Sequence, residues 1–274
     1  MLIDTHSHLN FKAYDADREE VIRRAQKEGV VCIDVGTKYE TSKLAIELAE
    51  RHEGIYAAIG IHPIHIKTDL MKLKMDEDEG AFEPLGEEYD KERYRELVKS
   101  EKVVAIGEIG LDYYYKPKTT TRQEQFKQKQ KEVFVQQLDL AKELDLPVIF
   151  HCRMAHADAV KILKNYPGLK GVMHCFTGTV EEMNKYLDLG FYIGINGIIF
   201  KLSLDEVIKQ CPLDRILVET DCPYLTPTKA GPKETRNEPS FVKYVAERIA
   251  ELKGISFDEV AFATTANAKK LFKI

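Results

Sequence analysis

Short apolar runs alternate with longer amphipathic stretches along almost the whole chain. The apolar runs span about four to seven residues and are continuous rather than alternating, a pattern typical of strands buried on both faces of a parallel sheet. They predict strands at residues 2–5, 30–36, 55–61, 103–108, 146–151, 171–174, 191–195 and 216–219. The amphipathic stretches predict helices at about 15–28, 41–52, 91–100, 122–144, 157–165, 180–189, 205–210, 240–252 and 258–272.

This alternation predicts a (β/α)8 TIM barrel, an α/β fold in which eight parallel strands are surrounded by helices. The chain of 274 residues has a suitable length, and we predict one domain over residues 1–274. The alternative is a doubly wound open sheet, which would carry a glycine-rich phosphate loop after the first strand. This chain has His6-Ser7-His8 there instead. An acidic stretch at 76–90 has little periodicity and is expected to be a solvated loop insertion.

Composition and charge narrow the class of protein. Hydrophobic residues make up 44% and charged residues 31%, as in soluble proteins, and we expect no membrane span and no secretory signal. Five widely separated cysteines with no C-x-x-C argue against a disulfide framework and a thiolate zinc site, and they favour a cytoplasmic location. At a net charge of -5, a polyanionic substrate would have to be held by a local basic patch or by metal ions.

Ionisable side chains recur where the predicted strands end. His6 and His8 follow the first strand two positions apart, so both imidazoles can lie on one face of the extended chain. Four further candidates end or follow later strands, namely Glu108, His151, His174 and Asp221. Barrel enzymes build their active sites at the carboxyl ends of the strands, so we expect these six side chains to meet there.

The six side chains suit more than one metal ion. Four imidazoles and two carboxylates exceed the three protein ligands typical of a single catalytic zinc, and they suit two divalent ions with one bridging carboxylate. Imidazoles favour Zn, Ni or Fe, whereas carboxylates favour Mg or Mn, so the ligand chemistry leaves the identity of the metal open.

Three cysteines, Cys152, Cys175 and Cys222, directly follow candidate ligands. Adjacent side chains of an extended strand point to opposite faces. If the ligands point into the site, the cysteines should therefore point away from it, as small buried apolar residues.

The motifs around these residues resemble those of the TatD family of metal-dependent deoxyribonucleases. The matching segments occur in the same order over essentially the whole chain, at residues 3–8, 60–63, 107–113, 151–153, 174–178, 219–224, 237–239, 265–268 and 271–272. The acidic insertion at 76–90 departs from a compact member of the family, although loops on barrels vary freely.

This resemblance implies an amidohydrolase-type barrel with two metal positions. One ion would be held by His6, His8, Glu108 and Asp221, and the other by Glu108, His151 and His174, with Glu108 bridging. The implied activity is magnesium-dependent hydrolysis of DNA, commonly as a 3′-to-5′ exonuclease on single strands. Family members are also credited with removing D-amino acids from tRNA.

A phosphodiester hydrolase of this kind assigns roles to several residues. Two ions would activate a water, and Asp221, together with Glu108, would be catalytic, because Asp221 can ligate a metal and accept the proton of that water. Arg153 is predicted either to contact a phosphate or to form an ion pair on a loop. His62 is predicted either to donate to a phosphate or to pack its turn. Tyr113, Tyr114 and Tyr115 are predicted to offer a base-stacking face, with at least one of them packed in the core instead.

Two rival functions use the same scaffold. An amide or ester hydrolase, including a D-aminoacyl-tRNA deacylase, would use the same metals. A barrel without catalysis would serve as a binding protein, and the complete ligand set argues against it. DNA is therefore the predicted partner, with tRNA as the alternative.

Overall fold

In the described residues 1–72, 76–80, 86–231 and 235–274 of the computed structural model, eight parallel strands form one sheet in the order β1 to β8. The strands are β1 (Leu2–Ser7), β2 (Val30–Val35), β3 (Ile55–Ile59), β4 (Val103–Asp112), β5 (Val148–Arg153), β6 (Gly171–Met173), β7 (Tyr192–Ile195) and β8 (Ile216–Val218). The circle closes just beyond β8, where Ser7 pairs with Cys222 and the Asp221 N–H donates to the His6 carbonyl at 2.8 Å. The predicted (β/α)8 barrel is confirmed.

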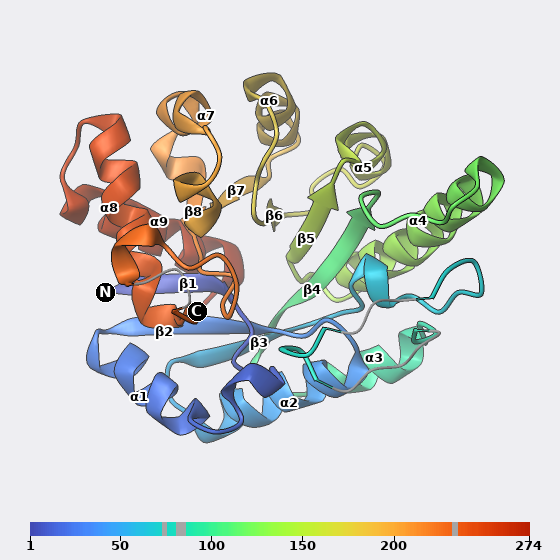
Figure 1. Ribbon diagram of the computed structural model, residues 1–274, viewed down its shortest axis with the longest axis horizontal. Coiled ribbons are helices and arrows are strands. Elements are labelled where there is room, and N and C mark those ends of the chain that lie inside the picture. Colours follow the sequence, from blue (N-terminus) through green and yellow to red (C-terminus); the bar gives the residue numbers. More distant parts are fainter. Residues whose placement is uncertain (73–75, 81–85, 232–234) are drawn as a thin grey trace.

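Helices follow the strands and surround the sheet (Figure 1). The α-helices are α1 (Arg18–Lys27), α2 (Tyr39–Arg51), α3 (Lys91–Leu97), α4 (Thr120–Glu143), α5 (His156–Leu163), α6 (Val180–Asp188), α7 (Asp205–Gln210), α8 (Val242–Lys253) and α9 (Phe257–Phe272). Short 3-10 helices lie at Lys12–Tyr14, Pro63–His65, Gly197–Phe200, Leu213–Arg215, Thr228–Ala230 and Pro239–Phe241. All nine predicted α-helices occur in the described residues, with ends within about three residues of those predicted.

The largest difference at a helix start occurs at α1 and is associated with a contact between residues distant in sequence. Helix α1 begins at Arg18 rather than at 15, because Lys12–Tyr14 forms a separate 3-10 turn. Asp17 precedes the helix but does not cap it with its side chain. Its carboxylate instead accepts from Arg236, at 2.6 and 2.9 Å. A contact distant in sequence has therefore replaced the local cap.

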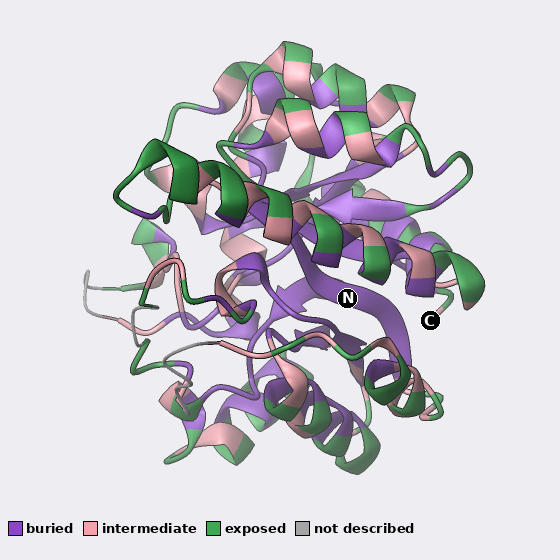
Figure 2. Cartoon of the chain, turned by 90° about the vertical axis from the view of Figure 1, so that its right-hand side faces the viewer, coloured by how far each residue is buried: buried purple, intermediate pink, exposed green. Residues whose placement is uncertain are grey.

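Two apolar layers stabilise the barrel. One fills its interior with strand residues such as Ile33, Ile149 and Leu217, and the other lies between the strands and the surrounding helices. Leu271 and Phe272 of α9 join the interior layer, and Thr265 of α9 donates to the Met1 carbonyl at 3.2 Å. Helix α9 thus covers the amino-terminal end of the barrel. Figure 2 shows the buried strands inside helices whose outer faces are exposed.

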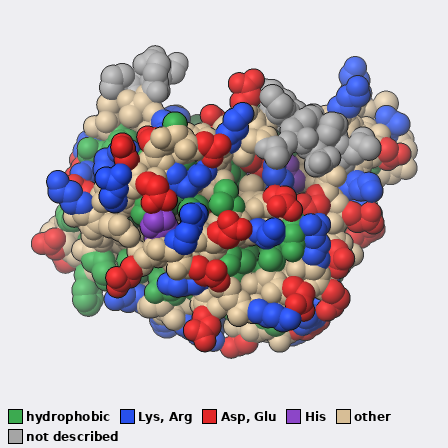
Figure 3. Space-filling view, turned by 90° about the horizontal axis from the view of Figure 1, so that it is seen from below, with side chains coloured by type: hydrophobic (Ala, Val, Ile, Leu, Met, Phe, Trp, Pro, Cys, Tyr) green, Lys and Arg blue, Asp and Glu red, His purple; other side chains and the backbone are tan. Residues whose placement is uncertain are grey.

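Charge on the outer surface is mixed. Over the face seen in Figure 3, below helices α1 to α3, acidic and basic side chains are interspersed. A polyanion would therefore be held by a local site rather than by that face. None of the helices in the described residues is long and apolar enough to cross a membrane.

Candidate metal centre and active site

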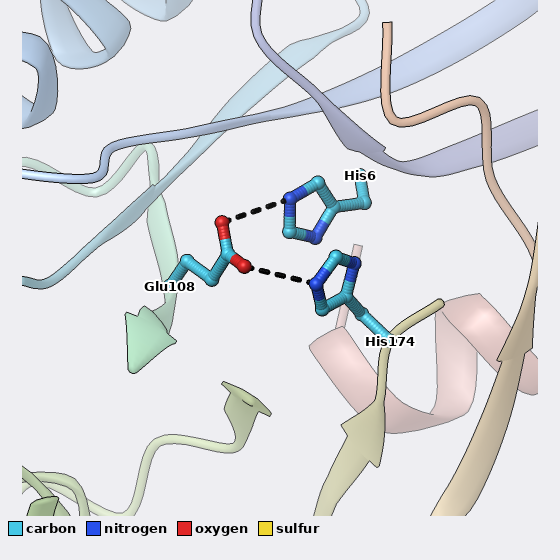
Figure 4. A group of neighbouring side chains, drawn as sticks. All are labelled: His6, Glu108 and His174. Atoms are coloured by element: carbon cyan, nitrogen blue, oxygen red, sulfur yellow. Dashed lines mark ion pairs between the residues drawn. The ribbon is translucent and has the colours of Figure 1, made fainter. Parts of the chain in front are cut away.

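The six predicted ligand side chains meet in one cluster at the carboxyl ends of the strands, centred on Glu108. His6, Glu108 and His174 place ligand atoms within 4.8 Å of one another, and so do His6, His8 and Asp221. In Figure 4 the two oxygens of Glu108 point to different imidazoles, one from β1 and one from the end of β6. A third group at the same spacing combines Glu108 and His151 with His62.

The strand that carries Glu108 is longer than predicted. β4 does not end at Glu108 but continues to Asp112, and Gly110 pairs with His151 of β5. Gly110 has φ +131°, and a Cβ there would lie 2.0 Å from the His151 carbonyl oxygen. Only glycine allows this pairing, which the apolar pattern that ended at Glu108 did not reveal. The extension places Asp112 beside Arg153 at the barrel mouth.

The two oxygens of Glu108 divide the cluster into two halves. Oε2 lies 3.4 Å from His6 Nε2 and 3.9 Å from His8 Nε2, and both imidazoles also face Asp221 Oδ1, at 3.8 and 3.4 Å. Oε1 lies 2.9 Å from His174 Nε2, 3.2 Å from His151 Nδ1 and 3.3 Å from His62 Nε2. His62 was predicted to contact substrate or pack its turn, and the structure places it among the imidazoles around Glu108.

Outer partners orient three of the imidazoles. His8 Nδ1 donates to the Val35 carbonyl at 2.8 Å, so Nε2 is the nitrogen that faces the centre. His151 Nε2 faces Asp112 at 3.2 Å, and His174 Nδ1 faces Glu219 at 3.4 Å. Sequence reasoning did not assign these two carboxylates. Both lie within the family-like motifs, but nothing in the sequence indicates which histidine each would meet.

The electrostatics of the cluster favour positive charge at its centre. Burial opposes ionisation of Glu108, but the imidazoles of His62, His174 and His6 hold its pKa well below the usual value. Asp221 behaves alike, because the His8 hydrogen bond and nearby imidazoles outweigh burial and lower its pKa. Burial lowers the pKa of His8, yet Asp221 and Glu108 raise it to about 8.

These residues fit divalent cations. Both carboxylates are ionised and face only imidazoles, and within the described residues no Lys or Arg forms an ion pair with Glu108 or Asp221. Buried carboxylates and imidazoles that converge without a fixed cation are the usual setting of a metal site. Groups of ligand atoms that could hold a metal ion lie on each side of Glu108.

The cluster lies in a cavity of about 460 Å³ at the barrel mouth. Part of its wall comes from the acidic stretch at 76–90, of which 81–85 lie outside the described residues. The expectation of a solvated loop is wrong for Glu79, which is buried, 2.8 Å from His65 Nε2 and 3.2 Å from Lys38 Nζ. Asp76 accepts from the Tyr224 hydroxyl at 2.8 Å. Long-range ion pairs thus draw this segment onto the rim, which its composition could not indicate.

The predicted substrate contacts are distributed around this cavity. Arg153 and His62 both line it. Tyr113 does not, because its hydroxyl donates to Asp158 at 2.8 Å and its ring lies near Lys127. The next two residues, Tyr114 and Tyr115, are the exposed tyrosines of this loop.

The cysteine prediction is confirmed in part. No cysteine of the described residues belongs to a metal-ligating group. Cys152 touches the cavity wall, but its sulfur lies 3.6 Å from both His156 Nδ1 and the Tyr186 hydroxyl, on the side of helices α5 and α6. For Cys175 the prediction is wrong, because β6 ends at Met173 and strand alternation no longer applies. Cys175 has φ +47° and lines the cavity.

A parallel barrel with a buried histidine–carboxylate cluster at the carboxyl ends of its strands defines the class of metal-dependent barrel hydrolases. The family model described as TatD related DNase matches residues 3–273. The chain belongs to this family, and it is a TatD family metal-dependent hydrolase.

Individual relatives agree with this assignment. The chain is 46% identical to the uncharacterized metal-dependent hydrolase YabD of Bacillus subtilis, with both chains fully covered. It is 36% identical to the 3′-5′ ssDNA/RNA exonuclease TatD of Cronobacter sakazakii, over 99% of this chain and 97% of that protein. Among solved structures, the TatD homologue YJJV of Escherichia coli superposes with a TM-score of 0.81 at 31% identity, covering 100% of this chain and 98% of that one.

Proposed function

We propose that this protein hydrolyses the phosphodiester bonds of single-stranded DNA from the 3′ end, with two divalent metal ions. The proposal rests on the position of Glu108, whose two carboxylate oxygens face separate groups of ligand atoms. A carboxylate between two such groups is suited to bridge two ions. When bound, such ions lower the pKa of a water and neutralise charge on a phosphate.

The chain's own residues supply the remaining steps. Asp221, ionised and at the cavity wall, accepts the proton of the attacking water. The Arg153 guanidinium, whose fork of donors suits phosphate oxygens, holds the substrate backbone. Asp112 keeps the His151 ring in place while this occurs.

The shape and charge of the cavity support attack at a chain end. Asp76 and Glu79 contact the loops after β8, β2 and β3, through Tyr224, Thr37 and His65, whereas Arg153 lies at the end of β5. In a closed barrel with strand order β1 to β8, the β8–β1–β2 side faces the β4–β5 side. A polyanion that enters over Arg153 therefore meets the exposed Asp76 carboxylate across the cavity, which favours a substrate that ends there over one that passes through.

A comparison of linear and circular substrates tests this proposal. With Mg²⁺ or Mn²⁺, a 5′-labelled single-stranded oligonucleotide should shorten stepwise from its 3′ end, and circular single-stranded DNA should resist. Cleavage of the circle would contradict the exonuclease assignment. Release of D-amino acid from charged tRNA, without release of nucleotides, would favour the deacylase alternative instead. Activity that persists in a verified metal-free preparation would exclude the two-ion mechanism.

A further inference from the structure

Two exposed aromatic rings lie at the mouth of the cavity, directly after β4. Tyr114 is 51% exposed and Tyr115 is 38% exposed, and within the described residues the other exposed aromatic side chains, Phe257 and Phe262, lie on α9. The guanidinium carbon of Arg153 lies 3.7 Å from the centre of the Tyr114 ring, and the two tyrosine rings are 5.1 Å apart. Together Tyr114, Tyr115 and Arg153 form a ledge, of which Tyr115 and Arg153 line the cavity. Exposed apolar surface beside a site is typical of ligand binding.

The ledge is fixed to the metal centre through one buried carboxylate. Asp112 Oδ1 accepts from the backbone N–H groups of Tyr114 and Tyr115, at 2.8 and 3.2 Å. The second oxygen of Asp112 faces His151 at 3.2 Å. The ledge therefore has a defined position relative to the cluster, instead of belonging to an independent loop.

The chemistry of the ledge matches a nucleotide. Every nucleobase has a flat face that stacks on aromatic rings and on guanidinium groups, without regard to sequence. Within the described residues no carboxylate forms an ion pair with Arg153, so its donors are available to a phosphate. A nucleobase can stack on a tyrosine ring, and the Arg153 guanidinium beside the ring can contact the phosphate of the same nucleotide.

We propose that the ledge of Tyr114, Tyr115 and Arg153 is a nucleobase-stacking subsite for the end of a single-stranded substrate. This inference rests on the proposed nuclease function. Tyr114 and Tyr115 stack on bases next to the scissile phosphate, and Arg153 contacts the backbone between them. The subsite gives affinity for single strands, because the bases of a duplex are already stacked on one another.

Removal of bases rather than of phosphates tests the subsite. The substrates are a short single-stranded oligonucleotide and its twin with abasic residues in place of the two nucleotides at the 3′ end. Base stacking is worth about 1–3 kcal/mol per base, and two bases are removed, so wild-type protein should show a KM at least about 30-fold lower for the base-bearing strand. The Tyr114→Ala/Tyr115→Ala variant should lose this preference to within about twofold, with kcat at saturation nearly unchanged.

Two variants serve as controls. Tyr114→Phe/Tyr115→Phe keeps both rings and should keep the preference. Phe262→Ala removes a ring that is 79% exposed on α9, at the other end of the barrel, and should have no effect. Because each variant is compared on two substrates, a loss of folded protein would lower both activities equally and leave the ratio unchanged.

A binding measurement without turnover completes the test. In EDTA, an oligonucleotide with 2-aminopurine at its 3′ end should be quenched on binding to wild-type protein, and the double alanine variant should abolish this quenching. If wild type and the double alanine variant prefer the base-bearing strand over the abasic strand to the same extent, the subsite is overturned and the nuclease function remains intact. If wild-type protein cleaves neither strand with any divalent ion, the proposed function fails. The subsite is then tested by the 2-aminopurine measurement alone, and absence of quenching on binding would overturn it.

Discussion

At the scale of the residue, the protein concentrates its chemistry in a few buried ionisable groups. Glu108 is 4% exposed and His6 is fully buried, yet the Glu108 carboxylate stays ionised because three imidazoles outweigh the cost of burial. The roles of these groups differ through their surroundings. Asp221, whose side chain is 16% exposed, is the carboxylate of the pair that a water can reach.

Substitution of Asp221 separates proton transfer from binding. Asp221→Asn keeps the shape and a coordinating oxygen but cannot accept the proton, so kcat should fall by about 10²–10⁴-fold. Asn tolerates the φ of +56° at this position, so the turn should remain folded. Affinity for single-stranded DNA, measured by fluorescence anisotropy, should change much less.

Arg153→Ala provides the converse case, with a raised KM and a smaller loss of kcat. Single-turnover kinetics on a short oligonucleotide distinguish the two variants. If Asp221→Asn cleaves near the wild-type rate with its metals retained, Asp221 is not the proton acceptor.

At the scale of the element, long-range side-chain contacts hold the barrel mouth in shape. Helix α4 carries two fully buried glutamines that act as clamps on strand ends. Gln137 accepts from the Ile61 N–H at 2.8 Å and donates to the Ile61 carbonyl at 3.1 Å, and Gln130 does the same for Asp112, at 2.8 Å in both directions. These amides take the place of backbone partners where β3 and β4 approach the site.

Loss of one clamp should destabilise the fold. Gln137→Ala leaves a buried N–H and a buried carbonyl of Ile61 without partners, at a cost of about 1–3 kcal/mol each. The free energy of unfolding, measured in urea by circular dichroism, should therefore fall by about 2–6 kcal/mol. Gln128→Ala removes an exposed glutamine of the same helix and should change it by less than about 0.5 kcal/mol. Equal effects of the two substitutions would contradict the clamp.

The described part of the acidic segment should stabilise the fold in a pH-dependent way. Burial raises the pKa of Glu79, but His65, Lys38 and Thr37 outweigh it and lower the pKa from 4.5 to about 2. A lowered pKa means that stability is present above pH 4.5 and is lost as the pH falls toward 2. The shift corresponds to about 3 kcal/mol at most.

Glu79→Gln should therefore lower the free energy of unfolding at neutral pH by about 1–3 kcal/mol. The difference from wild type should shrink by about 1 kcal/mol at a pH of about 3.5. Urea unfolding at both pH values measures this, with Glu77→Gln as the exposed control in the same segment. A difference that does not change with pH would mean that the ion pairs of Glu79 contribute nothing.

At the scale of the whole molecule, the candidate ligands couple metal binding to the integrity of the barrel. His6, Glu108, His151, His174 and Asp221 come from β1, β4, β5 and the loops after β6 and β8, so the cluster exists only when the circle is closed. A ligand that binds the folded state alone raises its stability. A second contact also joins the two ends of the barrel, because Asp4 of β1 accepts a hydrogen bond from the N–H of Thr220, which follows β8, at 2.9 Å.

Metal removal should therefore lower the melting temperature. At a free metal concentration of about 100 Kd the stabilisation is about 2.7 kcal/mol, which corresponds to a shift of roughly 5 °C for a chain of this size. Differential scanning fluorimetry with and without EDTA, followed by addition of Mn²⁺, Mg²⁺ or Zn²⁺, measures it. His6→Ala should abolish the shift, whereas His52→Ala, which removes a histidine that faces Glu19, should retain it. A melting temperature that no divalent ion changes would argue against a metal centre.

The sequence by itself determined the architecture and the set of residues at its centre. Continuous apolar runs predict buried strands, and this pattern is local, because burial on both faces requires apolar side chains at every position of the strand. His6, His8, Glu108, His151, His174 and Asp221 could be placed on one rim, because parallel barrel strands bring their carboxyl ends together. The family-like motifs pointed to the same residues.

Only the tertiary structure decided the pairings between distant residues. Four such pairs join segments that are distant in sequence, and the local sequence pattern of neither segment predicts its partner. They are Glu79 with His65, Asp112 with His151, Glu219 with His174 and Asp17 with Arg236. The end of β4 depended on the neighbouring backbone of β5, and the orientation of Cys175 depended on a turn that replaced a strand. Local patterns encode which side chains are buried, whereas the choice among buried polar partners is made by distances that exist only after the chain has closed.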